Sequence, residues 1–98
     1  MVLENIVYNE LIVKGYDVYI GKTKNGEVDF LAKKDGITKY IQVTYQLDNI
    51  STLEREFGAF KVIDDNYSKY VISLETRDFS RDGITHVNLI DFLMNDEF

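Results

Sequence analysis

Two oxygen-bearing side chains, Asp29 and Gln42, are the strongest candidates for chemistry in this sequence. Asp29 falls in a predicted strand at 27–33 and Gln42 in a predicted strand at 37–45. If the apolar faces of both strands point to one core, the two side chains project together from the other side. A carboxylate beside an amide oxygen is a pair of hard ligands of the kind that holds Mg²⁺ or Mn²⁺. With one His and no Cys, the sequence disfavours a zinc site.

This placement depends on strict alternation along each strand. The apolar face is expected to consist of Val28, Phe30, Ala32, Ile41 and Val43. Glu27 and Leu31 then share the face of Asp29, while Tyr40 and Thr44 share the face of Gln42.

Other elements position these two strands. The stripe that predicts a helix over 3–14, ended by Gly15, consists of Leu3, Ile6, Val7 and Leu11. A strand at 16–22 follows. Turn signals then separate the three strands, Asn25-Gly26 between the first and second and Asp35-Gly36 between the second and third. Two tight turns in succession predict a three-stranded antiparallel meander.

A second helix should follow the meander. Ser51 and Glu54 have the spacing of a capping box, with Ser51 as N-cap, and the helix is expected to end near Ile63. A buried strand is predicted at 69–74, and a last strand and short helix at 85–89 and 91–94. The fold class is therefore α/β with the order helix, three-stranded meander, helix, strand, in a single domain over residues 1–98.

Composition limits the classes of protein that remain. The 98 residues are 45% apolar and include no Cys, so one packed core is expected without disulfides. No apolar run approaches the roughly 20 residues that span a bilayer, and the first residues lack the basic region of a secretory signal. We expect a cytoplasmic protein with no membrane contact. The net charge of −6 opposes tight autonomous binding of nucleic acid.

Three sequence blocks carry a resemblance to a known family. They are Leu3 to Leu11, Glu27-Val28-Asp29-Phe30 and Tyr40-Ile41-Gln42-Val43. Together they are similar to a C-terminal domain of uncharacterised function in bacterial and archaeal P-loop ATPases of the AAA+ type. The acid on the second strand and the triplet Gln42-Val43-Thr44 on the third resemble the PD-(D/E)XK nuclease-like fold. The resemblance covers nearly the whole chain.

The resemblance implies a set of site residues. Asp29 and Gln42 match the positions that hold a divalent ion, and Glu4 matches an acid on the first helix that joins the site. Thr44 stands at the lysine position and supplies no positive charge, while Gln42 replaces a carboxylate. Because the lysine migrates in this fold, the other candidates for its role are Lys22, Lys33 and Arg55.

Three hypotheses follow for function. The favoured one is a degenerate, non-catalytic nuclease-fold module that serves as an interaction or regulatory domain of an AAA+ ATPase. The alternative is an Mg²⁺- or Mn²⁺-dependent DNA nuclease with a migrated or missing lysine. A self-associating homodimer is the third. Weak DNA contact is assigned to a lysine cluster on the meander that includes Lys22, Lys33 and Lys39. His86, the single His, is expected to be structural.

Overall fold

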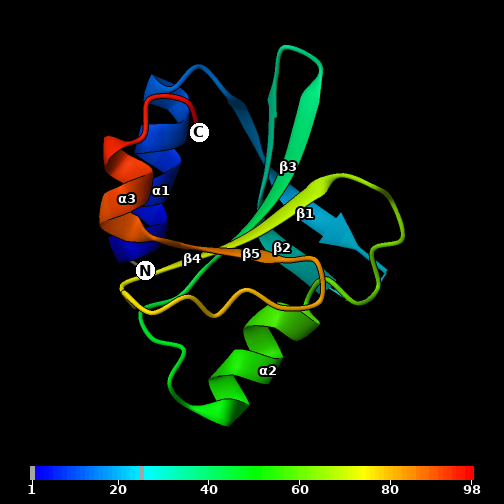
Figure 1. Ribbon diagram of the computed structural model, residues 1–98. Helices are drawn as coiled ribbons and strands as arrows, with labels where there is room; N and C mark the ends of the chain where they lie inside the picture. The colour runs from blue at the N-terminus through cyan, green and yellow to red at the C-terminus, as the bar shows by residue number, and fades with distance from the viewer. Residues whose placement is uncertain (1, 25) are drawn as a thin grey trace.

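A five-stranded mixed sheet with helices on both faces forms the molecule (Figure 1). The computed structural model describes residues 2–24 and 26–98. In chain order the elements are α1 (Val2–Val13), β1 (Asp17–Thr23), β2 (Gly26–Lys34), β3 (Ile37–Val43), α2 (Ile50–Gly58), β4 (Ser68–Ser73), β5 (Thr85–Asn88) and α3 (Leu89–Met94). The predicted α/β class and the order helix, meander, helix, strand are confirmed.

The strands lie in the order β1-β2-β3-β4-β5. β1, β2 and β3 pair antiparallel, as the two tight turns require, whereas β4 pairs parallel to β3 and β5 parallel to β4. A parallel pair needs a crossover connection, and α2 supplies it between β3 and β4. The meander and the crossover therefore meet at β3, the central strand that carries Gln42.

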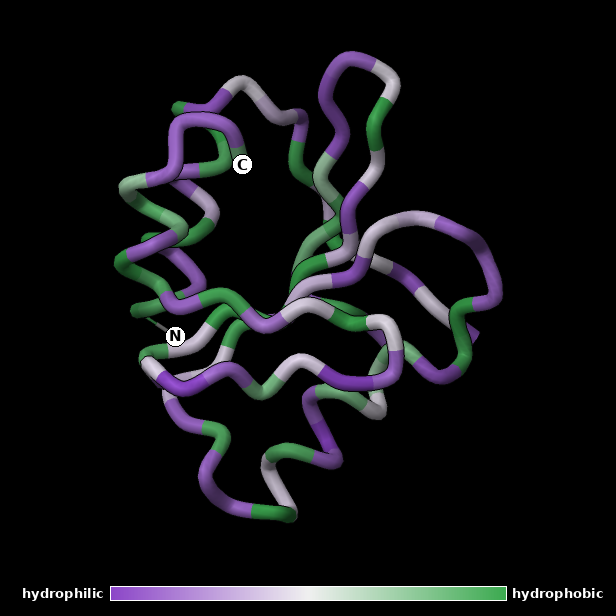
Figure 2. The backbone as a smooth tube through the Cα atoms, in the orientation of Figure 1, coloured by the Kyte–Doolittle hydropathy of each residue, from purple (hydrophilic) through white to green (hydrophobic). Residues whose placement is uncertain are grey.

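Hydrophobic clusters cover the two faces of the sheet. One lies beneath α1 and α3 and is centred on Leu11, Ile41, Ile72 and Phe92. The other lies beneath α2 and contains Val28, Leu47, Phe57, Phe60, Val71 and Ile84. The apolar segments of the chain accordingly converge on both sides of the central strands (Figure 2). Because both faces are covered, the side chains of β3 and β4 alternate between two cores.

The first helix follows its predicted stripe except at one position. Leu3, Val7 and Leu11 are buried, but Ile6 is 37% exposed, so its assignment to the core was wrong. Ile6 lies one step around the helix from the buried stripe, on the side that faces solvent. Gly15 has a φ of +94°, the left-handed conformation that ends helices and favours glycine.

The two meander turns differ in what the structure describes. Asp35 and Gly36 have φ values of 52° and 80°, as a two-residue turn with two left-handed central residues requires, so this hairpin is confirmed. In the other hairpin Thr23 pairs with Gly26, in agreement with the predicted strands. Asn25 lies outside the described residues.

A bulge in β2 overturns the predicted face of Val28. The pairing with β1 shifts between Tyr19 and Gly21, so that Asp29 and Phe30 together oppose the single residue Ile20. Such an insertion reverses the alternation along the bulged strand. Val28 therefore lies in the cluster beneath α2, whereas Phe30 packs against the cluster beneath α1. The bulge falls at the residue that the sequence singled out for chemistry.

The cap of α2 also differs from the prediction. Asn49, not Ser51, is the N-cap, because its side chain accepts a hydrogen bond from the Thr52 N–H at 3.2 Å. The helix ends at Gly58, with Ala59 as C-cap, well before Ile63. Asn and Ser are about equally good N-caps, so intrinsic preference does not decide between them. The path of the chain after β3 does.

Within residues 2–24 and 26–98, none of the helices is long and apolar enough to cross a membrane.

Candidate functional site

The candidate site lies where β2 and β3 separate. Their backbone pairing ends at Phe30 and Ile41. Beyond that point two side chains replace the ladder. The Asp29 N–H donates to Gln42 Oε1 at 2.6 Å, and the Val43 N–H donates to Asp29 Oδ2 at 2.8 Å. We call this reciprocal pair the Asp29–Gln42 clasp. The predicted meeting of Asp29 and Gln42 is thus present, and each side chain satisfies a backbone amide of the opposite strand.

Glu56 joins the clasp from α2. Gln42 Nε2 donates to Glu56 Oε1 at 3.3 Å, and both side chains are buried. Glu56 was not among the predicted site residues. The sequence did indicate a buried polar contact there, because Glu56 lies three residues after Leu53 on the apolar stripe of the helix. A carboxylate on a core-facing stripe needs a polar partner, and Gln42 is that partner.

Glu4, on the first turn of α1, reaches the same place as the resemblance implied. Its carboxyl group lies close enough to that of Asp29 to raise the pKa of Asp29. Burial raises the pKa of Asp29 to about 6, and the charges of Glu4 and Glu56 act in the same direction, while the Val43 N–H opposes the shift. Burial also raises the pKa of Glu56, against the lowering effect of Arg55. The crowded carboxyl groups therefore favour a bound proton.

Divalent metal is the cofactor that the resemblance implies, and the donor atoms can be tested against it. Gln42 Oε1, the amide atom that would bind a cation, already accepts the Asp29 N–H, and Asp29 Oδ2 accepts the Val43 N–H. Among the described residues, no three His, Cys, Asp or Glu side chains are grouped so that they could hold a metal ion. As arranged, the clasp does not fit a divalent ion, and we derive no catalytic step through one.

Thr44 stands at the position that the resemblance assigns to the lysine. This side chain is buried, and its hydroxyl donates to the Gln46 carbonyl at 3.5 Å. Of the substitutes, Arg55 pairs with a residue that joins the clasp, because its Nε lies 3.2 Å from Glu56 Oε2. Lys22 pairs instead with Glu27 at 3.1 Å, and Lys33 lies over the Tyr19 ring.

Lys39 does not belong to the predicted phosphate-facing surface. Its side chain is buried, and its ammonium lies over the rings of Tyr16, Tyr70 and Phe98. It also donates to the main-chain oxygen of Phe98. Burial lowers the pKa of Lys39 accordingly. The prediction was wrong because alternation places Lys39 on the core face of β3, with Ile41 and Val43.

His86 is structural, as expected. Its Nδ1 accepts the Phe79 N–H at 3.3 Å, so in the neutral ring Nε2 carries the proton and donates to Ser73 Oγ at 2.7 Å. Burial lowers the pKa of His86 and favours this neutral form. The Ser73 hydroxyl is fully buried. The contact between the two side chains joins β4 to β5.

The raised pKa of Asp29 predicts a specific dependence of stability on pH. The folded state binds a proton up to about pH 6, whereas the ordinary pKa is 3.8. The stability that Asp29 contributes is therefore complete below pH 3.8 and is lost as pH rises to about 6. Asp29→Asn resembles the protonated form. At pH 8 its free energy of unfolding is expected to exceed that of the wild type by about 1 kcal/mol, after allowance for partial exposure.

Urea unfolding of both proteins between pH 4 and 8 measures this difference. The gap should grow with pH and level off above about pH 7. Asp17→Asn, at an exposed position of β1, is the matched control. An Asp29→Asn protein that is less stable than the wild type at pH 8 would contradict the prediction.

Comparison with known proteins gives a family and one relative of interest. The family model described as "Domain of unknown function (DUF4143)" matches residues 1–93. A Haemophilus influenzae protein described as uncharacterized is 34% identical over 93 residues, which are 94% of this chain and 22% of that relative. The chain thus spans less than a quarter of the length of the relative. No solved structure matches the chain.

Proposed function

The chain belongs to the DUF4143 family, and from this premise we propose that it is a non-catalytic module of the nuclease-like fold. In this proposal the domain serves as an interaction or regulatory part of a longer polypeptide that contains an AAA+ P-loop ATPase. The length of the Haemophilus relative supports a longer polypeptide, since most of that protein lies outside the match.

The Asp29–Gln42 clasp is the observation that carries the proposal. The two residues at the metal positions satisfy the backbone where β2 and β3 separate, at 2.6 and 2.8 Å. Gln42 also connects the sheet to α2 through Glu56. Groups with these hydrogen bonds stabilise the fold and are already occupied, so they are poorly placed to bind a ligand. Thr44 at the lysine position agrees with this role, because it provides no cation.

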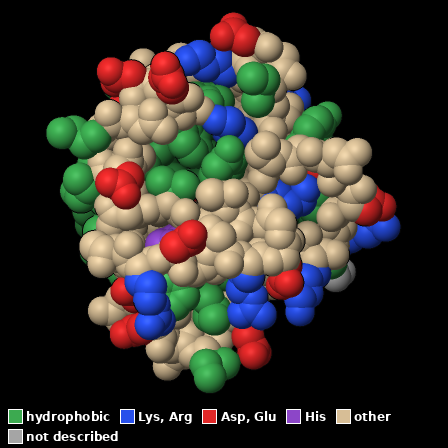
Figure 3. Space-filling view, in the orientation of Figure 1, with side chains coloured by type: hydrophobic (Ala, Val, Ile, Leu, Met, Phe, Trp, Pro, Cys, Tyr) green, Lys and Arg blue, Asp and Glu red, His purple; other side chains and the backbone are tan. Residues whose placement is uncertain are grey.

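An exposed apolar stripe supports a role in protein contact. α1 and α3 lie side by side, and Lys14, just after α1, donates to the Asn95 carbonyl beyond α3 at 2.7 Å (Figure 1). Apolar side chains are exposed over α3 at the left of Figure 3. The most exposed members on the two helices are Val2, Val13, Ile90 and Met94, between 58% and 79% exposed. Exposed apolar patches commonly mark protein interfaces. The occupant in this proposal is the ATPase part.

DNA contact is a weaker part of the proposal. Lys22 and Lys33 remain exposed on the meander, but Lys22 is paired with Glu27 and the chain carries a net charge of −6. Any affinity through these two lysines should therefore be small and should fall steeply with salt.

A cleavage assay tests whether the module is catalytic. Linear, circular and branched DNA are incubated with Mg²⁺ or Mn²⁺ and with wild-type domain, Asp29→Ala or Asp29→Asn. We expect no metal-dependent cutting that depends on Asp29. Gln46→Ala, an exposed substitution near the same strand end, is the control for preparation quality.

Cutting by the wild type and by Gln46→Ala, but by neither Asp29 variant, would establish the alternative, an Mg²⁺- or Mn²⁺-dependent nuclease. Arg55→Ala would then be the first variant to examine, since Arg55 pairs with Glu56 and could supply the positive charge that Thr44 lacks. Light scattering on the same preparations separates a monomer from the homodimer of the third hypothesis, and Met94→Glu should abolish a contact made through the α1–α3 stripe.

A further inference from the structure

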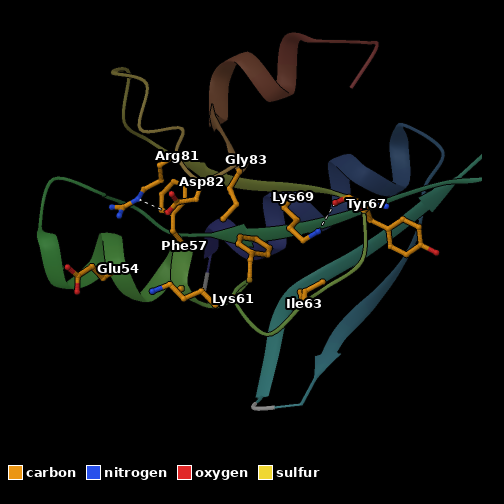
Figure 4. Close-up of a pocket in the computed structure, with 13 residues that line it drawn as sticks. Glu54, Phe57, Lys61, Ile63, Tyr67, Lys69, Arg81, Asp82 and Gly83 are labelled. Carbon is orange, nitrogen blue, oxygen red and sulfur yellow. Dashed lines mark hydrogen bonds and ion pairs between the residues drawn. The ribbon is translucent and has the colours of Figure 1, made fainter.

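A pocket of about 430 Å³ opens on the α2 side of the sheet, away from the clasp. It is lined by residues from α2, from the segment that follows α2, from the start of β4 and from the turn before β5 (Figure 4). Its volume is in the range of sites that hold small molecules. None of Glu4, Asp29, Gln42 and Glu56 lines it.

The floor of the pocket is apolar and firmly held. Phe57, Phe60 and Ile84 line it and belong to the buried cluster beneath α2, and Ile63 packs against that cluster. A floor fixed by the core changes shape little when a ligand binds. Flat apolar groups are suited to such a surface, because aromatic rings contact one another over a large area.

Positively charged side chains reach the rim from separate segments. Arg81 lines the pocket from the turn before β5 and Lys61 from the segment after α2 (Figure 4). Within the described part of the chain the Lys61 side chain forms no ion pair or hydrogen bond. Arg81 contacts Asp82 through Nε alone, at 3.4 Å, which leaves its terminal nitrogens available. Lys69 also lines the pocket, but Asp65 and Tyr67 already accept its hydrogen bonds.

Gly58, at the end of α2, is a position where the pocket can be tested by substitution. It ends α2 with an ordinary φ, and a Cβ placed on it would meet nothing within 4 Å. Neither conformation nor packing therefore requires glycine here, although glycine costs about 1 kcal/mol relative to alanine in a helix. Gly58 lines the pocket, and the open space around it would accept a larger side chain.

We propose that this pocket binds a small ligand in which a flat apolar ring carries an anionic group, either phosphate or carboxylate. The ring would lie on Phe57 and Phe60, and Lys61 and Arg81 would hold the anion. Glu54 and Asp82 also line the pocket, so that a cation-bearing ligand has acidic partners too. Asp82 is engaged with Arg81, however, so Glu54 stands alone against Lys61 and the terminal nitrogens of Arg81, and this balance favours the anion.

This assignment is independent of the proposed function. The pocket and the clasp share no residue, and a module without catalysis can still sense a small molecule. A ligand bound between α2 and the turn before β5 would stabilise the position of α2, which the clasp holds from its other side through Glu56.

Backbone amide chemical shifts in the wild-type domain test the proposal. The probes are phenyl phosphate, adenosine monophosphate, phenylacetate and inorganic phosphate, each up to about 5 mM. We expect saturable shifts at pocket residues with at least one aromatic anion. Tighter binding of adenosine monophosphate identifies a nucleotide source, and tighter binding of phenylacetate an aromatic acid. Inorganic phosphate alone should bind at least about tenfold more weakly.

Two variants locate the binding. Gly58→Leu should fold with at least wild-type stability and lose the shifts, because leucine fills the pocket. Lys61→Ala combined with Arg81→Ala should weaken binding about tenfold or more. Asp17→Asn, at an exposed position of β1 outside the pocket, should bind as the wild type does. The proposal is overturned if no aromatic anion binds saturably, if inorganic phosphate binds equally well, or if Gly58→Leu binds unchanged.

Discussion

Gln42→Glu is expected to lower the free energy of unfolding by about 3 kcal/mol at pH 8. The substitution places a carboxylate beside Asp29 and Glu56 in a buried position. It also replaces the N–H donor that now meets Glu56 Oε1 at 3.3 Å with an oxygen that repels it. Desolvation and repulsion act in the same direction, which makes this one of the two largest effects we expect in the molecule.

The size of the loss should depend on pH. A buried carboxylate among others has a raised pKa, so the carboxyl group introduced by Gln42→Glu would be protonated near pH 5 and would then destabilise less. Urea unfolding at pH 5 and pH 8 measures both values. Gln46→Glu adds the same charge at an exposed site and should change stability by less than about 0.5 kcal/mol. Equal losses in the two variants would show that the clasp is not buried in solution.

Lys39→Ala is expected to lower the free energy of unfolding by about 2–3 kcal/mol. The side chain is buried, and its ammonium lies between 4.0 and 5.4 Å from the centres of three aromatic rings. Truncation removes this contact and the stem that packs against the rings. It also leaves the main-chain oxygen of Phe98 with one donor, the Tyr16 hydroxyl at 2.6 Å.

A second substitution separates charge from packing. Lys39→Met keeps most of the stem, so it should lose about half as much as Lys39→Ala. Lys33→Ala removes an exposed lysine of the neighbouring strand and should have little effect. Thermal and urea unfolding of the three variants give the comparison. A Lys39→Ala protein as stable as Lys33→Ala would place Lys39 on the surface, as the sequence alone had suggested.

Local signals predicted the elements well, because each depends on residues that are close in the chain. Asp35-Gly36 determines its hairpin through two left-handed residues, whatever the rest of the molecule does. Gly15 ends α1 for a similar reason. The pairing of Asp29 with Gln42 was also within reach, because two tight turns place their strands side by side.

The errors came from contacts between distant segments. Alternation predicts the face of Val28 only if β2 is regular, and the bulge opposite Ile20 is a property of two strands. Lys39 was assigned to the surface by its charge, but its ammonium is surrounded by rings from the residue before β1, from β4 and from the end of the chain. Glu56 could have been found, since a carboxylate on an apolar stripe needs a partner. Its partner, Gln42, lies 14 residues away in sequence.

The order in which substitutions can accumulate is constrained by the clasp. A chain that acquires a carboxylate at position 42 loses stability, since Asp29 and Glu56 are already there. A loss of about 3 kcal/mol is a large fraction of the stability of a small domain. Descendants of this sequence would therefore need a compensating change, such as a cation near Glu56 or a neutral residue in its place, before an acid at position 42 could be accepted.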